Sequence, residues 1–101
     1  MDTHFRFQVG QPIHHKVFGY RGVIVEADPN FSQSEIWYTI MTQSNPPKNL
    51  PWYYILVDNS DCTCYVCEKN LEPDLSGKEV KNPNLTLYFN KLECGLYQKN
   101  Y

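Results

Sequence analysis

The four cysteines of this chain are its strongest candidates for specific chemistry, because their thiolates could bind a metal ion. Cys64 and Cys67 have the CxxC spacing of a zinc site, and Cys62 precedes them by two residues. The alternating residue types of this segment predict a strand, on which Cys62 and Cys64 face one side and Cys67 the other. Three thiolates so placed cannot converge on one ion unless the strand breaks. We therefore expect reduced structural cysteines, Cys94 included, and no metal or other cofactor.

A disulfide framework is the alternative for four cysteines in a chain of 101 residues. Such frameworks are typical of small secreted domains. The first residues, Met1–Arg6, lack the apolar stretch of a signal peptide, and no apolar run is long enough to span a membrane. We therefore expect a cytoplasmic protein that has no membrane contact.

The remaining reactive side chains do not form a catalytic pattern. His14 and His15 are adjacent, so on a strand they point to opposite faces and cannot act as a pair. Asp58 and Asp61 flank a turn, where aspartate is expected for backbone hydrogen bonding, and Cys67 could be a nucleophile only beside a base. The sequence has no GxSxG, P-loop or HExxH motif. We expect a binding module rather than an enzyme.

A glycine-bracketed turn between two apolar segments predicts the binding surface. Val17-Phe18 ends one segment and Val23-Ile24-Val25 forms the next, with Gly19-Tyr20-Arg21-Gly22 between them, which is typical of a β-hairpin. Basic and aromatic side chains at such a turn can contact phosphate and stack on bases. The candidate nucleic-acid or partner residues are His15, Lys16, Tyr20 and Arg21. The alternative is that Tyr20 packs on the sheet and Arg21 is merely solvated.

A second candidate surface lies on the most apolar segment, Trp52–Val57, which predicts a strand. Trp52 and Tyr54 share one face of it and form a candidate oligomer or partner surface, with burial in the core as the alternative. The net charge of −2 weighs against affinity that depends on phosphate neutralisation. Arg6, Lys16 and Arg21 all precede residue 22, so a local basic face remains open.

The elements that must position these residues are short. Strands are expected over about 12–17, 22–28, 52–57 and 62–67, with a single helical turn over 68–71. Ser32 and Glu35 have capping-box spacing and predict a short helix, although Trp37–Ile40 could instead extend. Asn82-Pro83 predicts the start of a last helix, whose apolar face would carry Leu85, Tyr88, Phe89 and Leu92. One domain, 1–101, built as a small bent β-barrel, is expected.

Several segments, in order, support a family resemblance. They are Val9-Gly10-Gln11, His15-Lys16, Phe18-Gly19-Tyr20-Arg21-Gly22-Val23, Asp28-Pro29, Pro51-Trp52-Tyr53-Tyr54-Ile55-Leu56-Val57, Glu68-Lys69-Asn70-Leu71 and Pro73-Asp74-Leu75-Ser76-Gly77. With them the chain resembles the YccV-like family, also called the HspQ or hemimethylated-DNA-binding heat-shock family, over nearly its whole length. The chain departs from the family at His14, where the family often has arginine, and at Tyr54, where it usually has histidine. The loss of a permanent charge at His14 weakens the case for DNA.

The resemblance implies a mainly β fold, a small SH3-like barrel with one short helix in a long loop and a short C-terminal helix. It also implies a homotrimer. The implied function is that of a non-enzymatic cytoplasmic heat-shock regulator in the stress response. It would act as an adaptor or modulator of ATP-dependent degradation by a Lon-type protease, with that protease and its protein clients as partners. The alternative is a hemimethylated-DNA-binding protein acting in replication control.

Overall fold

The computed structural model describes residues 4–42 and 44–100, and in these residues antiparallel strands dominate. The elements are β1 (Pro12–His15), β2 (Arg21–Asp28), α1 (Glu35–Met41), β3 (Trp52–Val57), β4 (Thr63–Cys67), the 3₁₀ turn η1 (Glu68–Asn70), β5 (Leu71–Pro73), α2 (Leu85–Tyr88), β6 (Phe89–Glu93) and β7 (Leu96–Lys99). The expected mainly β fold with two short helices is confirmed. Among the described residues, no helix is long and apolar enough to cross a bilayer.

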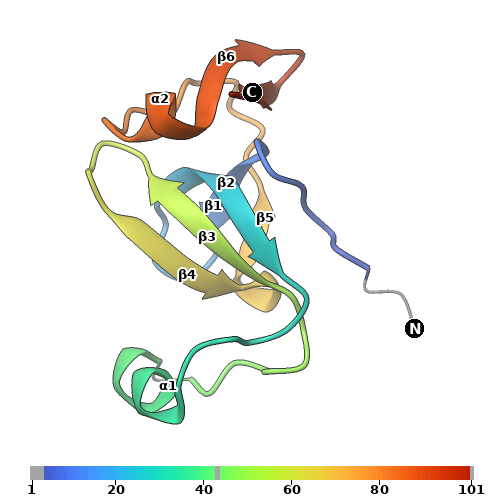
Figure 1. Cartoon of the computed structure of the whole chain (residues 1–101), viewed down its shortest axis with the longest axis vertical. Coiled ribbons are helices and arrows are strands. Elements are labelled where there is room, and N and C mark those ends of the chain that lie inside the picture. The colour runs from blue at the N-terminus through green and yellow to red at the C-terminus, as the bar shows by residue number, and fades with distance from the viewer. Residues whose placement is uncertain (1–3, 43, 101) are drawn as a thin grey trace.

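Five strands form one antiparallel sheet in the order β4-β3-β2-β1-β5. This sheet occupies the centre of the molecule, with α1 at its lower end and α2 and β6 above it (Figure 1). A bulge between Ile24 and Glu26 shifts the register of β2 against β3, and bulges of this kind bend a strand and increase its twist. Gly22 lies in the crowded part of the same pairing, where an added Cβ would approach the carbonyl oxygen of Leu56 to 2.5 Å. A glycine is therefore required where β2 leaves the turn.

The core divides into two clusters on the sheet. The first gathers around the fully buried ring of Tyr53 and contains Phe7, Ile13, Ile24, Tyr53, Ile55, Val66 and Leu71. The second lies under the C-terminal hairpin and contains Val23, Leu56, Val80, Phe89 and Tyr97. Phe7 reaches the first cluster from the N-terminal segment, whereas Phe5 lies edge-on to Tyr53 and stays 43% exposed. Burial of these side chains supplies most of the stabilisation of the fold.

Helix α1 begins two residues later than the sequence predicts. Its N-cap is Ser34, whose side-chain oxygen accepts the backbone N–H of Trp37 at 3.1 Å. Ser32 was the expected cap, but its hydroxyl donates instead to Asp28 at 2.6 Å. The alternative in which Trp37–Ile40 extends is wrong, because these residues lie inside the helix.

The last helix is short, as expected, but the predicted continuation of its apolar face to Phe89 and Leu92 is wrong. Helix α2 ends at Tyr88, and Phe89 begins a strand hairpin, β6 and β7, that forms a second small sheet. Cys94 and Gly95 turn the chain with φ of 53° and 78°. Phe89 is buried, and its ring centroid lies 5.6 Å from that of Tyr97 across the hairpin. This cross-strand packing stabilises a strand here more than the helical spacing of the apolar residues stabilises a helix.

Candidate functional site

His15 lies inside the β1–β2 turn rather than on its surface. Its side chain is 3% exposed, and its Nδ1 accepts the backbone N–H groups of Val17 at 3.1 Å and Phe18 at 3.0 Å. The His15 ring stacks on the Phe18 ring, with 4.7 Å between the ring centroids, and its centroid lies 5.0 Å from that of the Tyr20 ring. Burial, with the nearby His14, lowers the pKa of His15 from 6.5. The structure thus places this predicted partner residue inside the turn, where its acceptor nitrogen binds backbone groups.

Arg21 is held by two aspartates from distant parts of the chain. Its Nη1 donates to Asp58 and its Nε to Asp74, each at 2.9 Å, and Nη2 donates to the carbonyl oxygen of Lys78. The Arg21 side chain is only 18% exposed. Burial alone would raise the pKa of the Asp74 carboxyl, but hydrogen bonds from Arg21 and Ser76 outweigh it and hold the pKa below 3.8.

This geometry indicates a structural role for Arg21. The guanidinium fastens the start of β2 to the β3–β4 turn and to the segment after β5. Two carboxylates compensate its charge, so the candidate basic site loses its most strongly charged member for contact with phosphate. The separations of 37 and 53 residues in sequence explain why the sequence alone did not indicate these partners.

The exposed part of the turn is apolar with one cation. Val17 is 69% exposed and Phe18 is 77% exposed, and Lys16 beside them is exposed as well. We name Lys16, Val17 and Phe18 the hairpin tip. Tyr20, by contrast, packs against the first core cluster, and burial, with a contribution from Cys64, raises the pKa of its hydroxyl. Of the predicted residues, only Lys16 lies at the surface of the tip.

The sequence did not indicate the exposure of Val17 and Phe18, because these residues were interpreted as the end of a strand. Strand β1 stops at His15, and the turn already begins at Lys16. The signal was the pair of large apolar residues directly before Gly19, whose φ of +78° marks a turn and not a strand. Adjacent exposed apolar side chains form a continuous apolar area, and larger areas of this kind mark protein-binding surfaces.

Trp52 and Tyr54 lie beneath α1 in a cluster of aromatic rings. The cluster consists of Phe31, Trp37, Tyr38, Trp52, Tyr54 and Tyr65. Trp52 is 1% exposed and its ring nitrogen donates to the carbonyl oxygen of Pro47 at 2.9 Å. Tyr54 is half-buried, and its ring centroid lies 4.5 Å from that of Tyr65, with the two rings tilted by 38°. The structure thus places Trp52 in the interior, with Trp37 and Tyr38 of α1 against its ring.

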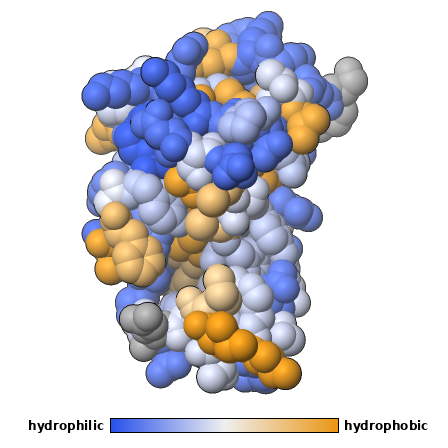
Figure 2. All heavy atoms as spheres, turned by 90° about the vertical axis from the view of Figure 1, so that its left-hand side faces the viewer, coloured by the Kyte–Doolittle hydropathy of each residue, from blue (hydrophilic) through white to orange (hydrophobic). Residues whose placement is uncertain are grey.

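The outer face of α1, above Trp52, is apolar and exposed. Ile36, Ile40 and Met41 are 72%, 71% and 62% exposed. Figure 2 shows an apolar area at the lower end of the molecule, where Figure 1 places α1. The aromatic cluster packs against α1 from below, so the apolar side chains on its outer face are exposed on a supported helix.

The four cysteines are free thiols. Cys62 and Cys94 are exposed, Cys64 is half-buried and Cys67 is buried. Burial raises the pKa of the Cys67 thiol. Within residues 4–42 and 44–100, no three His, Cys, Asp or Glu side chains are grouped as metal ligands.

The fold and these surfaces define a small antiparallel β protein that presents apolar side chains on a hairpin tip and on a supported helix. The family model of the YccV-like proteins, described as hemimethylated DNA-binding protein YccV like, matches residues 5–95. The chain therefore belongs to the YccV-like family.

Proposed function

We propose that this protein is a non-enzymatic adaptor or modulator of ATP-dependent, Lon-type protein degradation in the heat-shock response. The observation that carries the proposal is the exposure of Val17 and Phe18 on the hairpin tip. Clients of such a protease are unfolded chains that expose apolar segments, and burial of apolar area is the main driving force for protein association. Two large apolar side chains on a rigid turn can bind such a segment.

The turn beneath the tip is well suited to hold these side chains in place. The Nδ1 atom of His15 fixes the backbone of both Val17 and Phe18, and the imidazole stacks on the Phe18 ring. A partner therefore meets a preorganised surface and loses little conformational entropy on binding. Bringing client and protease together would raise their effective concentration without any chemistry by the adaptor.

Charge supports a protein partner over nucleic acid. The chain carries a net charge of −2, and the guanidinium of Arg21 is compensated by Asp58 and Asp74. Affinity for DNA depends mainly on lysine and arginine side chains that release counterions from phosphates. The hairpin tip offers Lys16 for this purpose, next to side chains that avoid water.

The second candidate function is hemimethylated-DNA binding in replication control, and the description of the family favours it. A titration of unmethylated, hemimethylated and fully methylated duplexes at two salt concentrations tests it. Preferential, salt-dependent binding of the hemimethylated duplex, lost in Lys16→Glu, would support this function. Equal or absent binding to the three duplexes would remove it.

Finer points of architecture belong to the same proposal. The five-stranded sheet, bent at the β2 bulge, supports the SH3-like barrel, and the family match over residues 5–95 supports a single domain over 1–101.

A homotrimer would cover the exposed face of α1. We expect light scattering to give about three times 11.9 kDa for the natural chain and a smaller mass for Ile36→Ser combined with Ile40→Ser. We also propose a cytoplasmic location for this adaptor.

The adaptor function is tested by the rate at which a purified Lon-type protease degrades an unfolded client with and without this protein. We expect a changed rate with the natural chain and no change with Phe18→Ser. Leu87→Ser is the matched control, because Leu87 is 71% exposed but lies in α2. If the natural chain leaves the rate unaltered, or if Phe18→Ser acts like the natural chain, the proposal is wrong.

A further inference from the structure

The second half of β2 has one unpaired backbone edge. Strand β1 pairs with β2 only as far as Pro12 opposite Val23. One step further, the N–H of Gly10 donates to the carbonyl oxygen of Ile24 at 2.8 Å, and the N–H of Ile24 donates to that of Gln11 at 3.2 Å. Beyond Ile24, no backbone group in the described parts of the chain bonds to this side of β2. We name this stretch, residues 25–28, the open edge.

The pairing on the other side shows which backbone groups the open edge presents. Val57 donates its N–H toward the β4 side at 3.0 Å, so Tyr54, three residues earlier, bonds toward β2. Glu26 lies opposite Tyr54, and Ala27 is the next residue along β2. Because successive residues of a strand alternate, the N–H and C=O of Ala27 point away from β3, into the open edge.

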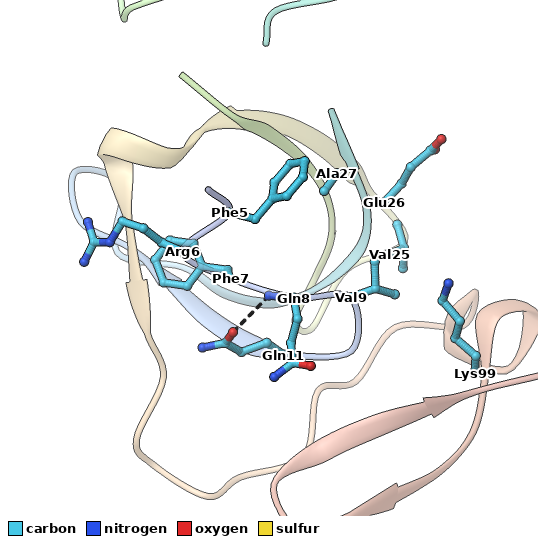
Figure 3. A pocket seen from close by; sticks show the side chains of 10 residues that line it. All are labelled: Phe5, Arg6, Phe7, Gln8, Val9, Gln11, Val25, Glu26, Ala27 and Lys99. Carbon is cyan, nitrogen blue, oxygen red and sulfur yellow. Dashed lines mark hydrogen bonds between the residues drawn. The ribbon is translucent and has the colours of Figure 1, made fainter. Parts of the chain in front are cut away.

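The open edge faces a hollow of about 600 Å³ between β2 and the N-terminal segment. Apolar side chains of Phe5, Val9, Val25 and Ala27 line it, and Figure 3 shows Phe5 and Ala27 on the same side of this space. The N-terminal segment leaves β2 free because its backbone has other partners. Phe7 donates its N–H to the hydroxyl of Tyr53 at 3.4 Å. The free N–H and C=O of Ala27, beside a hollow lined by both apolar and polar side chains, can pair with a further strand.

Charge indicates which kind of strand would fit. The ammonium group of Lys99 lies on the Val25 side of the hollow, whereas the carboxylate of Glu26 and the guanidinium of Arg6 point away from its centre (Figure 3). Lys99 has no carboxylate within 4.0 Å among the described residues. An incoming segment is therefore stabilised by an acidic side chain placed beside Lys99.

We propose that an extended, acidic segment of a partner protein adds to β2 along residues 25–28 as a further strand. Its backbone would pair with Ala27, its apolar side chains would enter the hollow beside Phe5 and Val9, and a carboxylate would meet Lys99. Backbone hydrogen bonds supply affinity in this mode of recognition, and the alternate side chains supply specificity. This site is separate from the hairpin tip, and it does not depend on the adaptor function.

A fluorescent peptide of about six residues, alternating valine and glutamate, tests the proposal by anisotropy with the full chain. We expect saturable binding. We also expect about ten-fold weaker binding of the valine–lysine peptide and of the valine–glutamate peptide N-methylated on alternate amides. Absence of binding, or equal binding of the three peptides, overturns the proposal. So does binding that N-methylation leaves unchanged, because strand addition requires those N–H groups.

Two measurements on the protein locate the binding. Lys99→Glu is expected to weaken binding of the valine–glutamate peptide about ten-fold and to strengthen that of the valine–lysine peptide. Lys81→Glu changes the net charge equally at an exposed lysine away from the hollow, and should leave both affinities as they were. The amide of Ala27 should exchange more slowly with solvent when the peptide is bound. Unchanged exchange at Ala27, or equal effects of the two variants, contradicts the assignment.

Discussion

Arg21→Met removes the one guanidinium that joins β2 to two distant loops. The methionine keeps much of the side-chain volume but leaves the carboxylates of Asp58 and Asp74 without their shared cation. These carboxylates are 12% and 9% exposed, so water compensates them only in part. We therefore expect a less stable protein, because two partly buried like charges then lie close together.

The size of the effect follows from the exposure of the group. Loss of one partner costs about 3–5 kcal/mol for a buried ion pair, and an exposed pair is worth about 0–1 kcal/mol. Arg21 is 18% exposed and engages both carboxylates, so the cost lies between these two limits. We expect about 2–3 kcal/mol in the free energy of unfolding and a decrease of roughly 10–20 °C in Tm.

The same difference must depend on pH in a defined direction. The folded protein holds the pKa of Asp74 below 3.8, mainly because hydrogen bonds from Arg21 and Ser76 overcome the effect of burial. A lowered carboxyl pKa adds stability that is complete above the unfolded value of 3.8 and is lost as pH falls through the lower folded value. The advantage of the natural chain over Arg21→Met should therefore shrink in that acidic window.

Urea unfolding followed by tryptophan fluorescence, at about pH 7 and about pH 3, measures both quantities. Lys16→Met is the matched control, because it removes an exposed cation and should change stability by less than about 0.5 kcal/mol. If Arg21→Met were as stable as this control at neutral pH, the claim that Arg21 stabilises the fold would be wrong. A stability difference that does not shrink with acid would refute its link to Asp74.

Three further predictions concern the turn, the packing and the thiols. His15→Ala should lower the free energy of unfolding by about 2 kcal/mol, because two backbone N–H groups lose their acceptor. Because burial lowers the pKa of His15, the natural chain should also lose stability as pH falls below 6.5. A pH series of urea unfolding in which His15→Ala loses as much stability as the natural chain would contradict this. Gly10→Ala, at φ +91° against a backbone carbonyl, should lose at least about 2 kcal/mol, and an unchanged Tm would show that the site relaxes freely. Mass spectrometry after partial thiol labelling should find Cys62 and Cys94 modified before Cys67, and early labelling of Cys67 would contradict its burial.

Local sequence signals predicted the elements whose structure depends on neighbouring residues. The run Val23–Val25 and the apolar segment Trp52–Val57 form strands as expected, because β-branched and aromatic residues fit a sheet covered on both faces. The predicted helical face does not continue to Phe89 and Leu92, because burial of Phe89 against Tyr97 favours a strand there. Helical spacing and strand formation compete there, and only the tertiary contact settles which prevails.

The site was harder to predict for the same reason. Lys16 lies exposed at the turn, whereas the contacts of His15 and Arg21 depend on residues that the sequence does not mark. His15 binds backbone groups of its own turn, and Arg21 binds an aspartate 53 residues away. A histidine or arginine at a turn has the same residue type whether it contacts solvent, a ligand or the interior, so composition alone cannot distinguish these cases.

The assignment of the hairpin tip to protein rather than nucleic acid is tested most directly by a titration of the ¹⁵N-labelled chain. An unfolded client of the protease and a hemimethylated duplex are added separately at about physiological ionic strength. We expect the client to shift the amide signals of Val17 and Phe18 in a saturable way, and the duplex to leave them in place. Saturable shifts of these signals by the duplex, with none from the client, would contradict the adaptor function.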